Sequence, residues 1–119
     1  MKPDCMFCRV VAGEIPSTRV AETDRVLAFL DINPGAPQHV VIIPKEHVAD
    51  SVADLEVDGP EPSAIWIDLL RVARQIATSS PEFAKGWRLV TNVGENGGQS
   101  VFHLHLHLLA GRRLLWPPD

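Results

Sequence analysis

Apolar residues recur at helical spacing in one long stretch of the chain, between residues 63 and 79. The stripe consists of residues three or four positions apart, widened by their neighbours: Ile65, Trp66, Leu69, Leu70, Val72, Ala73 and Ile76. This spacing predicts a helix over residues 63–79 that buries the stripe. A shorter helix is expected from Asp4, a good N-cap residue, to about Ala12, with Gly13 ending it. A third helix is expected over residues 47–55.

Five shorter stretches show the features of β-strands. Residues 40–43 are an unbroken β-branched run that ends at Pro44, which is typical of a buried strand. The other strands are expected at residues 19–22, 26–31, 87–93 and 101–109. Proline and glycine mark loops at residues 33–37 and 57–62. This order of strands and helices predicts an α+β fold with the helices packed on one side of a sheet.

Length and charge restrict the classes of protein that fit. The chain has 119 residues, enough for one domain over residues 1–119 but too few for two ordinary ones. Its net charge is −4 and it has no run of Lys or Arg, which argues against binding a nucleic acid polymer. No apolar stretch approaches the roughly 20 residues that span a bilayer, and none at the N-terminus has signal-peptide length. We therefore expect a cytoplasmic protein that does not enter a membrane.

The strongest chemical signal is a His-x-His-x-His motif in the last predicted strand. Because strand side chains alternate between faces, His103, His105 and His107 should share one face. The opposite face should anchor the strand to the core through Phe102, Leu104, Leu106 and Leu108. Histidine has an ordinary pKa of about 6.5, so it is largely neutral at cytosolic pH. A ring whose Nδ1–H donates to a backbone carbonyl would keep Nε2 free as a nucleophile.

Three interpretations of this motif remain open at this point. The imidazoles could act on a phosphorus ligand, form a catalytic zinc site, or make up a solvated strand edge. The preceding loop, residues 92–100, contains Gly94, Gly97 and Gly98. Such a turn can simply connect a hairpin, but it can also point backbone N–H groups inward and hold an anion. Its place directly before the histidines favours a phosphate.

The two cysteines, Cys5 and Cys8, form a Cys-x-x-Cys motif and are too few for a secreted disulfide framework. The motif has three interpretations. It could be a redox pair, two ordinary small residues on a short helix, or half of a tetrahedral zinc site that needs two further ligands.

The segment from Gly98 to Leu109 resembles the signature of the histidine triad (HIT) nucleotide-binding family. Residues 14–16, 28–32, 36–39 and 42–45 are also similar to the family's motifs, in the family's order. The ending at residues 111–118 resembles the HINT branch, although Asn33 stands where that branch often has Ser. The resemblance implies a HIT-like α+β fold, with one long helix and short helices packed on an antiparallel sheet, and a homodimer.

The resemblance also implies a purine nucleoside phosphoramidase. Such an enzyme hydrolyses purine nucleoside 5′-phosphoramidates or aminoacyl adenylates at the α-phosphorus and releases AMP or GMP. His105 would be the nucleophile and form a nucleotidyl intermediate, with His107 as a second catalytic residue. The implied nucleotide-binding residues are Ile15, Phe29 and Ile32 at the purine, Asp31 at the ribose, and Asn92, Gly98, Gln99, Ser100, His105 and His107 at the phosphate.

Relatives that bind zinc would use Cys5, Cys8, His47 and His103 to hold a structural Zn²⁺. His39 fits either a ring behind His105 or an ordinary core residue. Trp116 fits either a position near the partner's site or a tail packed at the dimer interface. Two alternative functions remain: a zinc hydrolase that uses the histidine face as its metal site, and a non-catalytic nucleotide-binding regulatory module.

Overall fold

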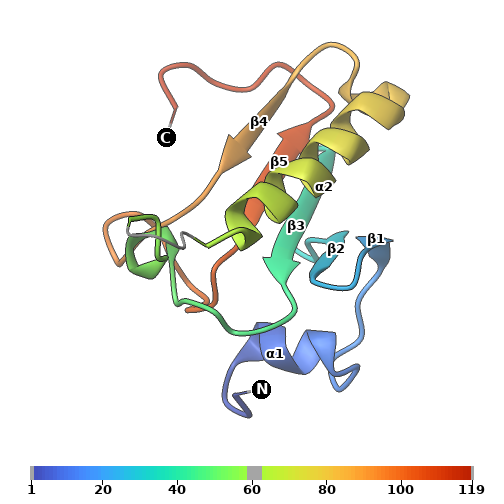
Figure 1. Ribbon diagram of the computed structural model, residues 1–119. Helices are drawn as coiled ribbons and strands as arrows, with labels where there is room; N and C mark the ends of the chain where they lie inside the picture. The colour runs from blue at the N-terminus through green and yellow to red at the C-terminus, as the bar shows by residue number, and fades with distance from the viewer. Residues whose placement is uncertain (1, 59–62, 119) are drawn as a thin grey trace.

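A computed structural model describes residues 2–58 and 63–118 (Figure 1). Its elements in chain order are α1 (Met6–Val11), β1 (Arg19–Glu22), β2 (Val26–Leu30), β3 (Gln38–Pro44), the 3₁₀ turn η1 (Val52–Asp54), α2 (Ile65–Ser79), the 3₁₀ turn η2 (Pro81–Phe83), β4 (Trp87–Val90) and β5 (Leu106–Ala110). The strands form one sheet in the order β1-β2-β3-β5-β4, and every neighbouring pair is antiparallel. The predicted α+β class with an antiparallel sheet is confirmed.

Each face of the sheet carries its own apolar core. One core joins α2 to alternate strand residues, among them Val26, Ala28, Val40, Ile42, Leu106 and Leu108. The other joins α1 to the residues between them, Leu27, Phe29, Val41 and Ile43. Because β2 and β3 are apolar at consecutive positions, both of their faces need cover. The prediction that all helices pack on one side is therefore wrong, since α1 lies on the face opposite α2.

The N-terminal helix begins one residue later than predicted. Cys5, not Asp4, is its N-cap: the Cys5 backbone is extended, and its Sγ accepts from the Cys8 N–H at 3.4 Å. Gly13 follows the helix with a φ of +79°, a left-handed conformation that glycine adopts readily, so the end of the helix agrees with the prediction.

The helix predicted over residues 47–55 is absent, and this stretch contains only η1. The Ala49 carbonyl accepts from the Leu104 N–H at 2.9 Å, and the Asp50 carbonyl accepts from Gln99 Nε2 at 2.7 Å. In a helix these two carbonyls would accept hydrogen bonds from residues four positions later. Here they bind the segment that leads into β5 instead.

The last two strands are shorter than predicted at the ends that approach the site. β4 ends at Val90, which pairs with His107, and residues 101–105 lie outside any strand. Beyond the paired region, the Thr91 hydroxyl donates to the His105 carbonyl at 2.9 Å. Leu104 is fully buried as expected, but Phe102 is 56% exposed, so its predicted place in the core is wrong.

The predicted loop at 57–62 lies outside the described residues from position 59 onward. Within the ranges that the structure describes, no helix has both the length and the apolar character needed to cross a bilayer.

Candidate functional site

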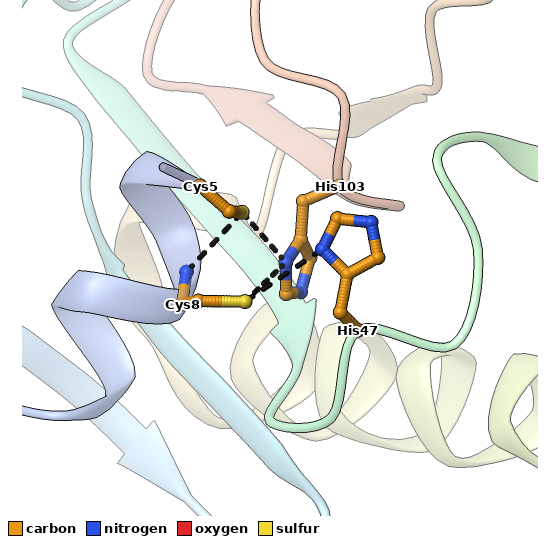
Figure 2. A group of neighbouring side chains, drawn as sticks. All are labelled: Cys5, Cys8, His47 and His103. Atoms are coloured by element: carbon orange, nitrogen blue, oxygen red, sulfur yellow. Dashed lines mark hydrogen bonds between the residues drawn. The ribbon is translucent and has the colours of Figure 1, made fainter. Parts of the chain in front are cut away.

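Two cysteines from α1 and two histidines from distant segments meet at one end of the sheet (Figure 2). Cys5, Cys8, His47 and His103 place one ligand atom each within 4.8 Å of the others. The His103 Nδ1 lies 3.3 Å from Cys5 Sγ and 3.6 Å from Cys8 Sγ, and the His47 Nδ1 lies 3.6 Å from Cys8 Sγ. A tetrahedral zinc ion, about 2.3 Å from sulfur and about 2.0–2.1 Å from nitrogen, separates such ligands by about 3.5 Å. The spacing fits zinc.

The His47 and His103 rings are each held in a tautomer that suits metal binding. The His47 Nε2 lies 2.7 Å from Asp50 Oδ1, and the His103 Nε2 lies 2.8 Å from the Pro44 carbonyl oxygen. Because both acceptors need a donor, each Nε2 carries the hydrogen and each Nδ1 turns its lone pair toward the cysteines. Metal-bound histidines in proteins commonly have such an outer partner.

The charge balance of the cluster also fits a cation. Both thiols are free and buried, and His103 is fully buried. Burial raises the pKa of the Cys5 thiol, because a thiolate in an apolar setting lacks water to solvate it. A divalent ion would supply the missing positive charge. The four residues together therefore suit a structural metal site better than a redox pair.

A cavity of about 270 Å³ lies on the α1 face of the sheet, beside this cluster. This volume is close to the lower end of the roughly 300–1,000 Å³ found for small-molecule sites. The predicted nucleotide-binding residues that line it are Ile15, Phe29, Asp31, Ile32, Ser100, His105 and His107. Its described wall contains the Asp31 carboxylate but no Lys or Arg. Neutral N–H and O–H groups would therefore have to hold a bound anion.

The ring of His105 is held in one tautomer. Its Nδ1 lies 2.7 Å from the His103 carbonyl oxygen, so Nδ1 carries the hydrogen and Nε2 has the free lone pair. The Phe7 ring meets it edge to face, with centroids 5.1 Å apart. His105 is only 5% exposed, and burial lowers its pKa, although the carbonyl bond opposes the effect. The ring is therefore neutral, and it lines the cavity with the lone pair of Nε2 free.

A second hydrogen-bonded chain fixes His107. The Gly35 N–H donates to His39 Nδ1 at 2.9 Å, so the His39 hydrogen lies on Nε2, which is 2.9 Å from His107 Nδ1 and 3.5 Å from Asp31 Oδ2. This N–H···N bond leaves the His107 hydrogen on Nε2. Burial, with smaller contributions from His105 and His39, lowers the pKa of His107 to about 4. His39 thus lies behind His107 rather than behind His105.

The hydrogen bond between His39 and His107 also bears on a second group of possible metal ligands. Asp31, His39 and His107 place potential ligand atoms within 4.8 Å of one another. Because the bond between His39 and His107 already uses their facing nitrogens, the arrangement is better described as a hydrogen-bonded chain than as a metal site.

Of the residues in the loop at 92–100 that were predicted to contact phosphate, only Ser100 lines the cavity. Asn92, Gly98 and Gln99 are not part of the cavity wall. Gln99 instead bonds within the protein, and Asn92 Nδ2 donates to the Gly97 carbonyl at 2.7 Å. A Cβ on Gly97 would lie 2.3 Å from the Val93 carbonyl oxygen, so only glycine fits there. The loop is tightly folded and presents Ser100 to the cavity.

Two residues of the site, Phe7 and Asp50, were missed by the sequence analysis. Phe7 packs on His105, and Asp50 orients His47. Their positions gave a signal: Phe7 lies between the two cysteines, and Asp50 follows His47 by three residues. Trp116 is 80% exposed and does not line the cavity of its own chain.

Comparisons with known proteins agree with this geometry. Residues 12–114 match the model of the HIT domain family. A 14 kDa zinc-binding protein from Zea mays is 45% identical over 95% of this chain and 86% of its own length. Adenylylsulfatase HINT1 from Arabidopsis thaliana is 42% identical over 95% of this chain and 75% of its own length. The crystal structure of a HIT family hydrolase from Legionella pneumophila has a TM-score of 0.87 and 44% identity, covering 98% of this chain and 100% of that one.

Proposed function

Since the chain belongs to the HIT domain family, we propose that it is a nucleotide hydrolase that cleaves purine nucleoside 5′-phosphoramidates or aminoacyl adenylates at the α-phosphorus. The products would be AMP or GMP and the free amine or amino acid. The names of two relatives, a HIT family hydrolase and an adenylylsulfatase, support hydrolysis of an adenylyl compound. The single observation that carries the proposal is the tautomer of His105, whose free Nε2 belongs to a ring that lines the cavity.

The cavity offers a suitable group for each part of the nucleotide. Apolar side chains in its wall, Phe29 and Ile32 among them, suit a purine ring. The Asp31 carboxylate can accept hydrogen bonds from ribose hydroxyls. The Ser100 hydroxyl and the His107 Nε2–H can donate to phosphoryl oxygens. These donors are neutral, so they would bind the anion by directed hydrogen bonds rather than by net charge.

Hydrolysis of a phosphoramidate would proceed in two steps. In the first, the His105 Nε2 electron pair forms a bond to the α-phosphorus, and the phosphorus–nitrogen bond breaks with its electron pair going to the amine, which takes up one proton from water. In the second, a water molecule attacks the phosphorus, the bond to Nε2 breaks, and one proton returns to solvent. The His107 Nε2–H would stabilise the charge on the phosphoryl oxygens in both steps.

The chain carries a structural zinc site made of Cys5, Cys8, His47 and His103. The geometry of the cluster and the zinc-binding relative from Zea mays agree on this assignment. A bound ion would tie α1 to the segments around β3 and β5 and would contribute to the free energy of folding. None of its ligands is the proposed nucleophile.

A homodimer is also proposed. β4 is an edge strand, and the Arg88 side chain donates to the Leu115 carbonyl at 2.9 Å, which holds the tail near that edge. Trp87, Leu115 and Trp116 are exposed by 41%, 78% and 80%. A second copy paired along this edge would cover these apolar side chains. Light scattering of the purified chain would test this; a monomer at micromolar concentration would contradict it.

The test of the catalytic proposal compares the wild-type chain with His105→Asn on an adenosine 5′-phosphoramidate. The substitution should lower kcat by on the order of 10⁴-fold or more, because it removes the nucleophile. The variant should still bind AMP. Wild-type protein, quenched in denaturant at alkaline pH, should carry an AMP group on His105. Glu95→Gln, a surface change in the neighbouring loop, is the control.

The alternative functions give different results in the same experiment. A zinc hydrolase would turn over the substrate without an adduct on His105. A non-catalytic binding module would bind AMP without turnover. Either result would contradict the proposed mechanism.

A further inference from the structure

His103 belongs to the zinc site and to the catalytic site at once. Its Nδ1 faces Cys5 Sγ at 3.3 Å, and its carbonyl oxygen accepts the His105 Nδ1–H at 2.7 Å. The side chain and the carbonyl are attached to the same backbone unit. A metal that fixes the side chain therefore also restricts the carbonyl that sets the His105 tautomer.

The backbone around His103 has little support from the sheet. Residues 101–105 lie outside β5. Three bonds anchor this stretch: Gln99 Nε2 donates to the Val101 carbonyl at 3.1 Å, the Leu104 N–H donates to the Ala49 carbonyl at 2.9 Å, and the Thr91 hydroxyl donates to the His105 carbonyl at 2.9 Å. The Leu104 N–H belongs to the same planar peptide unit as the His103 carbonyl, so the bond to Ala49 holds that unit on one side. The ring of His103, between the cysteines and the Pro44 carbonyl, is a second anchor, attached at the Cα next to that peptide unit.

Phe7 provides a second connection between the two sites. It lies on α1 between the two cysteine ligands, and its ring centroid is 5.1 Å from that of His105 and 5.9 Å from that of His103. α1 has only six residues, and a helix that short is not stable in water by itself. A metal held by Cys5 and Cys8 would keep the helix, and therefore the Phe7 ring, against His105.

We propose that the zinc site positions the nucleophile, because the metal fixes the His103 carbonyl and the Phe7 ring that together hold His105 with its Nε2 free. His103 and Phe7 are positioning residues in this scheme, since both act through His105. The inference rests on the proposed function for its effect on turnover, but its effect on the His105 ring can be measured without any substrate.

The first experiment follows the His105 ring as zinc is removed and restored. In the full chain with ¹⁵N-labelled histidine, long-range ¹H–¹⁵N spectra report which nitrogen of each ring carries the hydrogen. With zinc bound, His105 should show one tautomer with the hydrogen on Nδ1. After chelation, its signals should shift toward a mixture of tautomers, and zinc addition should reverse the change. The kcat should fall by about 10–100-fold and recover together with the spectrum.

The second experiment keeps zinc bound and weakens only the aromatic contact. Phe7→Leu should lower kcat by several-fold while zinc content stays at one ion per chain. The matched control is Phe83→Leu, the same substitution at a buried residue in the core on the α2 face. The control should lose stability without losing kcat. If chelation unfolds the chain, this comparison still tests, in the folded zinc-loaded chain, whether the Phe7 ring positions His105.

The outcomes separate this inference from the proposed function. A folded zinc-free chain that keeps a single His105 Nδ1–H tautomer and full kcat would overturn the positioning role, as would equal losses of kcat in Phe7→Leu and Phe83→Leu. If the zinc-loaded chain does not cleave phosphoramidates but its His105 tautomer still depends on zinc, the proposed function fails and the positioning role stands.

Discussion

Replacing Gln99 tests whether this side chain binds phosphate, as the family resemblance implies, or holds the loop in shape. In the structure its amide is fully engaged: Oε1 accepts from the Gly94 N–H at 3.0 Å, and Nε2 donates to the carbonyls of Asp50 at 2.7 Å and Val101 at 3.1 Å. The side chain is buried, and it joins the loop at 92–100 to the segment after His47. We expect its main effect to be on stability.

The size of the effect follows from these three bonds. Gln99→Ala removes them all, at about 1 kcal/mol each, and regains part of the side-chain entropy, which leaves a loss of about 1.5–3 kcal/mol. Gln99→Glu should cost at least as much, because its second oxygen would face two carbonyl oxygens that need a donor. Urea denaturation of the zinc-loaded chain, with m-values checked for equality, measures the free energy of unfolding.

Nucleotide binding provides the contrasting measurement. At temperatures where both proteins are folded, Gln99→Ala should change AMP affinity by much less than tenfold in isothermal titration. Glu95→Ala, an exposed change in the same loop, controls for general loosening. A variant that keeps its stability within about 0.5 kcal/mol and loses AMP affinity by tenfold or more would refute the structural role and restore the phosphate contact.

Three further predictions concern the loop, the ribose and acid stability. Gly97→Ala should lower the free energy of unfolding by about 1–3 kcal/mol because its Cβ would meet the Val93 carbonyl at 2.3 Å, and by more than Gly35→Ala, where the nearest atom, His39 Nδ1, lies 3.8 Å away; equal losses in urea denaturation would contradict this. Asp31→Asn should weaken AMP binding about tenfold but 2′-deoxy-AMP binding less, because the ribose hydroxyls lose a charged acceptor. Equal losses for the two nucleotides would show that the carboxylate does not bind the 2′-hydroxyl. Because the pKa of His107 is lowered to about 4 in the folded chain, the unfolded chain takes up its proton first, so stability should fall as pH drops from about 6.5 toward 4. His107→Asn should reduce this slope by up to about 1.4 kcal/mol per pH unit at equal zinc content, and an unchanged slope would contradict the assignment.

The elements predicted correctly are those whose shape depends on local pattern. In α2 and β3 the apolar pattern itself marks the buried side chains, at helical spacing in the first and as a continuous β-branched run in the second, so the pattern was sufficient to predict both elements. The helix expected over residues 47–55 failed because its carbonyls bond to residues some fifty positions away. The first half of the strand expected over residues 101–109 is absent for a related reason. There the His103 side chain contacts Cys5 and Cys8, and the backbone does not pair with the sheet.

The different hydrogen-bonding environments of His103, His105 and His107 could not be predicted from the sequence. Alternation along the chain indicated that the rings share one side of the strand, but it could not indicate which nitrogen of each ring is available. That choice depends on an acceptor or donor elsewhere: the Pro44 carbonyl for His103, the His103 carbonyl for His105, and the His39 ring for His107. These partners turn Nδ1 of the first ring toward the two cysteines, leave Nε2 of the second with a free lone pair and leave the hydrogen of the third on Nε2. Identical side chains at equal spacing thus receive different chemistry from groups that only the fold brings to them.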